Sequence, residues 1–102
     1  MDRLALQALL ESILGSDHVY FQPPSNVIMI YPAIRYSFTK IDGRYANNHR
    51  YTGEWVYQII YITKDPEPKS LVNQKLTELT YCKFDRSYVS DNLNHFVYSI
   101  TI

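Results

Sequence analysis

Apolar and polar residues along the chain recur with two different periods, which divide it into helices and strands. Residues 3–14 carry leucine and isoleucine at the three-and-four spacing of one helix face, and Asp2 is placed to cap the start. A shorter segment at about 69–79 repeats this spacing, with Ser70 or Asp65 as its cap. The pattern predicts two helices.

Outside these segments the side chains alternate with the period of two that is typical of strands. The predicted strands are 18–21, 32–39, 55–63, 81–88 and 95–102, with 27–30 as a further short extended segment. We therefore predict an α+β fold in the order α-β-β-β-α-β-β, as a single domain over residues 1–102. It has a small, mostly antiparallel sheet of four to five strands packed by two helices, and a long β-hairpin loop at about 40–54.

Residues 55–63, WVYQIIYIT, form the most apolar of these strands. One pleat face carries Trp55 and Ile59, and the other carries Val56 and Ile60, so both faces are apolar. Such a strand belongs in the centre of a sheet. We expect helices over one face and, because the chain has only two candidate helices, a protein partner over the other.

The segment 40–53 is polar and much longer than the two to five residues that a hairpin connection needs. Long loops on a small scaffold are typically either disordered or functional. Tyrosine and arginine are enriched at protein interfaces. We predict Tyr45, Arg50, Tyr51 and Trp55 as contact residues, while the simpler interpretation of the loop is a solvated hairpin tip.

Composition narrows the classes of function. Lysine plus arginine and aspartate plus glutamate number ten each, so no net field attracts nucleic acid or an anionic membrane. Cys82 is the only cysteine, which excludes an internal disulfide, and we interpret it as a small buried hydrophobe. No signal peptide or membrane-spanning run is apparent, so we expect an intracellular soluble protein. Ten tyrosines favour half-buried sheet surfaces and interfaces.

Residues with catalytic or metal-binding chemistry do not form a known motif. The three histidines lie far apart in the sequence, and there is no glycine-rich phosphate loop. The densest polar cluster comprises Asp85, Arg86, Asp91, Asn92, Asn94 and His95. We interpret it as an Asp85–Arg86 ion pair near a strand end and a turn built by the Asp and Asn residues, because no nucleophile stands next to a base. We expect no enzyme activity, no cofactor and no metal.

Three segments resemble a family of small proteins encoded among the head-to-tail genes of long-tailed bacteriophages. They are SILGSDHVYFQPP at 12–24, ITKDPEP at 62–68 and YCKFDRSYVSDNLNHFVYSI at 81–100. Members are known as tail terminator, tail completion or minor capsid proteins. The resemblance leaves out the 40–54 loop and contains no catalytic motif. It implies an α/β fold with a small sheet packed by helices, and a hexameric ring that caps the tail tube, ends its growth and receives the filled head.

The resemblance thus implies a structural virion protein of the tail or neck, assembled in the host cytoplasm. Its expected partners are copies of itself, the tail tube protein and a head-closure or connector protein, with DNA only as passing cargo and no membrane. A head-closure or neck adaptor at the same junction is the alternative within this class. A small nucleic-acid-processing enzyme or inhibitor is the alternative from a different class.

Overall fold

The computed structural model describes the backbone of residues 2–46 and 49–102 and the side chains of residues 2–41 and 54–102. Over these residues the chain forms two helices and five strands, which confirms the predicted α+β fold and element order. The elements are α1 (Arg3–Leu14), β1 (Val19–Phe21), β2 (Ala33–Ala46), β3 (His49–Thr63), α2 (Leu71–Thr77), β4 (Cys82–Ser90) and β5 (Leu93–Thr101). The segment 27–30 is not a strand in this structure.

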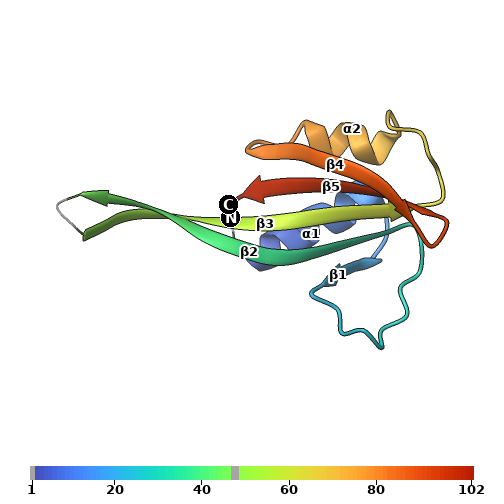
Figure 1. Cartoon of the computed structure of the whole chain (residues 1–102), viewed down its shortest axis with the longest axis horizontal. Coiled ribbons are helices and arrows are strands. Elements are labelled where there is room, and N and C mark those ends of the chain that lie inside the picture. Colours follow the sequence, from blue (N-terminus) through green and yellow to red (C-terminus); the bar gives the residue numbers. More distant parts are fainter. Residues whose placement is uncertain (1, 47–48) are drawn as a thin grey trace.

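The five strands form one sheet in the order β1-β2-β3-β5-β4 (Figure 1). β1 runs parallel to β2, and every other neighbouring pair is antiparallel. The strand predicted to be central, within β3, is central. Its Ile59 lies between Tyr36 of β2 and Tyr98 of β5.

Both helices begin at side chains that accept a backbone hydrogen bond. The Asp2 carboxylate accepts from the Ala5 amide at 2.8 Å, and the Ser70 hydroxyl caps α2 by accepting from Asn73. Ser70, rather than Asp65, is therefore the cap of α2. α1 ends at Gly15, whose φ of 81° is the left-handed conformation that glycine adopts without steric cost.

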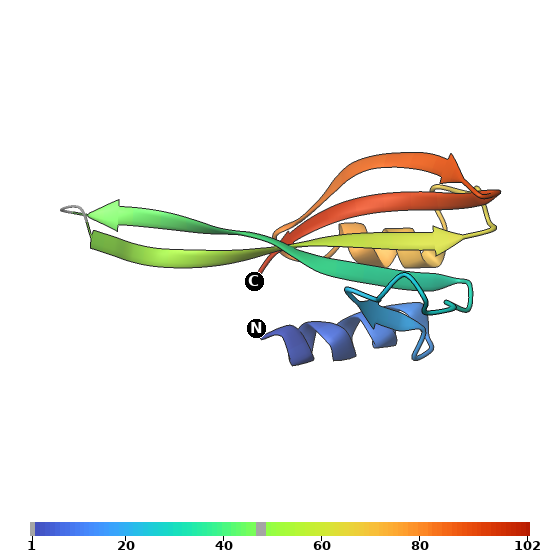
Figure 2. The ribbon, with the colours of Figure 1, turned by 60° about the horizontal axis from the view of Figure 1, so that its bottom comes forward.

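The two helices lie on the same side of the sheet, which we call the covered face (Figure 2). The core sits between them and the strands. Its fully buried members include Leu6, Leu10, Ile34, Tyr36, Ile59, Leu76, Tyr98 and Ile100. The Tyr98 hydroxyl donates to the Asn73 side-chain oxygen at 2.6 Å, so the polar group of each is satisfied inside this core.

The opposite face of the sheet, which we call the outer face, exposes less apolar surface than the sequence suggested. Ile62 and Val97 are 2% and 0% exposed although no helix lies over them. Ile62 sits between Ala33 and His95 in the register, and Val97 has Arg86 beside it on β4. Because side chains on neighbouring strands shield these residues, the expected apolar surplus on this face is largely absent.

The segment predicted as a long loop is a paired ribbon. β2 and β3 pair from Ala33 opposite Ile62 to Ala46 opposite His49, with one register shift between Phe38 and Lys40 and a second between Arg44 and Tyr45. Residues 41–46 and 49–55 extend past the rest of the sheet (Figure 1). We call these two stretches the arm.

Candidate interaction surface at the base of the arm

Three apolar side chains remain exposed where the arm leaves the core. Phe38 and Ile41 come from β2 and Trp55 from β3, and they are 38%, 38% and 47% exposed. The ring centroids of Phe38 and Trp55 lie 5.5 Å apart, and those of Phe38 and Tyr57 lie 5.6 Å apart with edge-to-face geometry. We call Phe38, Ile41 and Trp55 the apolar shelf.

A β-bulge brings the shelf onto one face. The register passes from Phe38 opposite Tyr57 to Lys40 opposite Val56, so Thr39 is an extra residue in β2. Strict alternation along β2 places Phe38 and Ile41 on opposite faces. The extra residue turns Ile41 back to the covered face, where it lies opposite Trp55.

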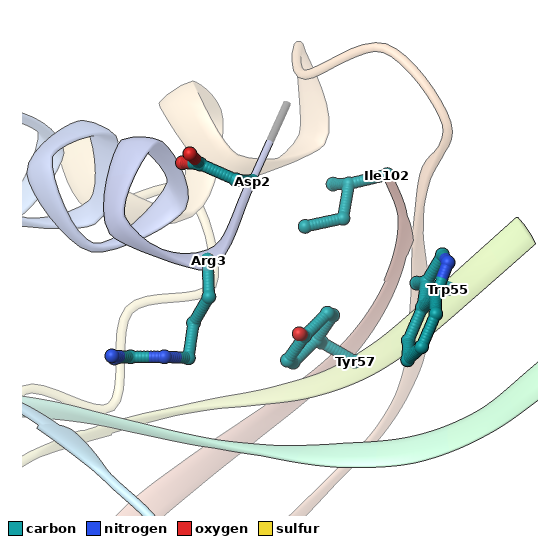
Figure 3. A pocket seen from close by; sticks show the side chains of 5 residues that line it. All are labelled: Asp2, Arg3, Trp55, Tyr57 and Ile102. Atoms are coloured by element: carbon teal, nitrogen blue, oxygen red, sulfur yellow. The ribbon is translucent and has the colours of Figure 1, made fainter.

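The shelf stays uncovered because the helical layer ends beside it. α1 begins at Arg3, and Trp55 and Tyr57 line a hollow of about 290 Å³ together with Asp2, Arg3 and Ile102 (Figure 3). Backbone hydrogen bonds in both directions between Trp55 and Ile102, at 3.2 and 2.9 Å, hold the end of the chain against the base of the arm.

The charged groups of this hollow already have structural partners. The Asp2 carboxylate caps α1 through Ala5. The Arg3 guanidinium lies 4.5 Å from the centroid of the Phe21 ring and donates to the Tyr36 hydroxyl. The hollow is thus at the small end of the range for ligand pockets, and both of its charged side chains are engaged in contacts within the protein.

Of the four predicted contact residues, Trp55 is a member of the shelf. Tyr45, Arg50 and Tyr51 belong to the arm by their backbone, and their side chains lie outside the described residues. Phe38 and Ile41 were missed by sequence reasoning. The signal for Phe38 was available, since it ends an alternating apolar series, whereas a bulge leaves no comparable mark in the sequence.

The polar cluster of β4 and β5 takes the structural roles predicted for it. Asp85 and Arg86 form an exposed ion pair. The turn at 91–92 has positive φ at both Asp91 and Asn92, which these residue types tolerate. The His95 ring stacks on Tyr88 with centroids 4.6 Å apart.

Cys82 lies half-buried against the core, in agreement with its interpretation as a small hydrophobe. Burial raises the pKa of its thiol to about 11, which disfavours the reactive thiolate. Within residues 2–46 and 49–102, no three histidine, cysteine, aspartate or glutamate side chains gather as metal ligands. Neither described helix has the length and apolar character needed to cross a bilayer.

The fold and surface define a small α+β domain with a projecting arm and an uncovered apolar shelf. Comparison of the chain with protein-family models, curated proteins and solved structures finds no match.

Proposed function

We propose that this protein is a structural subunit of a phage head-to-tail junction, which assembles as a ring at the head-proximal end of the tail tube, ends tube growth and joins tail to head. The observation that carries the proposal is the apolar shelf at the base of the arm. A half-exposed tryptophan beside a half-exposed phenylalanine is typical of a surface that another protein covers. The sequence resemblance supplies the kind of particle.

The shape of the subunit supports this function. The chain measures 50 × 30 × 24 Å, and the arm accounts for much of the long axis (Figure 1). An isolated two-stranded ribbon is marginally stable in water. An arm of this kind gains stability when a neighbouring subunit packs against it, as happens inside an assembly.

Truncation of the arm tests the proposal. Replacing residues 43–53 by Asn-Gly joins Asp42 to Glu54, which are already paired, through a two-residue turn. The core and both helices lie outside the deletion, so we expect the helical circular dichroism signal to be retained and melting to be nearly unchanged. In a complementation assay we expect the yield of infectious particles to collapse. A control variant, Asn48→Gly, keeps the arm at full length and should complement.

Electron microscopy of the failed particles separates the two roles at this junction. Loss of a terminator leaves tubes longer than normal, whereas loss of a head-closure adaptor leaves unjoined tails of normal length. We expect overlong tubes. Normal particle yield with the truncated arm would refute the proposed function.

A further inference from the structure

Large apolar side chains are also exposed at the two opposite edges of the sheet. β4 forms one edge, and the short strand β1 forms the other. The segment 27–31, which follows β1 on the way to β2, lies beyond that second edge (Figure 1). Each copy of the protein thus carries two different apolar edges that face away from each other.

The segment 27–31 reads VIMIY and has the composition of a buried strand. It is nevertheless not part of the sheet, and its Ile28 and Ile30 side chains are 89% and 58% exposed. A hydrogen bond of 3.2 Å from the Ile30 amide to the Tyr20 hydroxyl holds it near β1. Apolar β-formers exposed to this degree mark a site of protein contact.

The β4 edge offers the matching surface. β4 is last in the strand order, so within the described residues one of its sides pairs with β5 and the other has no strand beside it. The Thr101 amide donates to the Tyr81 carbonyl, and hydrogen-bonded and non-hydrogen-bonded pairs alternate along an antiparallel ladder. Phe84 therefore directs its backbone groups to the open side, and so does the Cys82 carbonyl, whereas the Cys82 amide already donates to the Leu79 carbonyl at 3.3 Å. Phe84 and Val89 are 51% and 68% exposed along it.

We propose that segment 27–31 of one copy adds as a strand to the β4 edge of a second copy. An open edge selects an extended segment through its backbone groups, and nine residues of β4 are long enough to receive five. The inference rests on the proposed function and deepens it. A contact between two different edges repeats in one direction from copy to copy, which is the arrangement that closes into a ring.

Cross-linking between two singly labelled proteins tests this contact. In a Cys82→Ala background of the full chain, one protein carries Ile28→Cys and the other Val89→Cys. A short bis-maleimide should link their mixture into heterodimers, while each protein alone should link poorly to itself. Leu4→Cys mixed with Val89→Cys is the control, because Leu4 is also largely exposed, at 67% against 89% for Ile28, but lies on α1 and belongs neither to segment 27–31 nor to β4.

A several-fold excess of heterodimer over the control mixture supports the proposal. Yield equal to that of the control overturns it, and linking of Val89→Cys to itself points instead to β4 pairing with β4. In addition, Ile30→Asp placed in the Ile28→Cys protein should abolish the excess, and Leu4→Asp placed in the same protein should preserve it. Failure of this contact in a protein that still joins heads to tails would reject the inference alone. Edge pairing in a protein without any role in joining would reject the proposed function alone.

Discussion

Two adjacent parts of β3, Trp55 and residues 57–63, continue one alternating series of apolar side chains but differ in burial. From Tyr57 to Thr63 its covered-face side chains are buried under the helices, and Ile59 is completely enclosed. Trp55, two residues before Tyr57 on the same face, is 47% exposed because α1 begins beside it. The same alternation therefore builds a core where α1 lies over the sheet and an exposed apolar surface beyond the start of that helix.

The difference teaches that apolar character alone does not locate the core of this protein. Ile62 and Val97 on the outer face are buried by their strand neighbours, while Phe38 and Trp55 on the covered face are not. Burial depends on which element lies above a residue and which side chains flank it. Residues that are apolar and unburied are the ones to examine for partners.

The largest expected loss of stability comes from a substitution in the core under the helices. Leu10→Ala removes a fully enclosed side chain of α1, and we expect it to lower the free energy of unfolding by about 2–5 kcal/mol, the usual cost of such a cavity. Urea denaturation measures the change. A loss well below this range would mean that the helix does not pack on the sheet as described.

The matching substitution on the part of the sheet that no helix covers is Trp55→Ala. Its side chain is half-exposed, so we expect a loss of stability of about 1 kcal/mol or less. Particle joining, however, should fall sharply in the complementation assay. A loss of stability from Trp55→Ala as large as that from Leu10→Ala would mean that Trp55 is part of the core and not exposed.

An intermediate effect is expected from Tyr98→Phe. The substitution leaves the Asn73 side-chain oxygen without its hydrogen-bond donor in the core, at a cost of about 1–3 kcal/mol. Tyr81→Phe is the control, because Tyr81 is exposed, and its melting temperature should not change. Equal melting temperatures for the two variants would argue against the buried bond.

The smallest effect is a loss of stability at alkaline pH. Burial raises the pKa of Cys82 from 9.0 to about 11, and burial also raises that of Tyr98 from 10.0 to about 12. Both groups are neutral when protonated, so the unfolded chain releases these protons first as pH rises. Stability should therefore begin to fall above pH 9.0, the ordinary value for the thiol.

Urea midpoints measured across this alkaline range check the prediction. Cys82→Ala should remove the part of the decline that begins first and leave the later part, to which the buried Tyr98 and Tyr36 contribute because burial raises the pKa of both. A midpoint that does not fall as pH rises, in the wild-type protein, would contradict the described burial of both groups.

The sequence was sufficient to predict most of the elements, because helix 3–14 and the alternating strands have strong periodicity and recognisable caps. The β-bulges could not be predicted from the sequence. The extra residue Thr39 in β2, and the extra residue between Phe84 and Arg86 in β4, reverse the alternation of side chains without a change in composition. The paired arm was also missed, since its polar residues suggest a loop. Trp55 could be selected as a contact residue from its type, whereas its exposure depends on where α1 starts.

Oxidative footprinting of Trp55 tests the central claim most directly, since it is the only tryptophan in the chain. Hydroxyl radicals would be applied to the free subunit and to joined head-tail particles, and oxidation would be quantified by mass spectrometry, with the buried Tyr36 as the unreactive reference. We predict that Trp55 is oxidised readily in the free subunit and is protected in the particle. Equal oxidation of Trp55 in both states would show that the apolar shelf is not an interface.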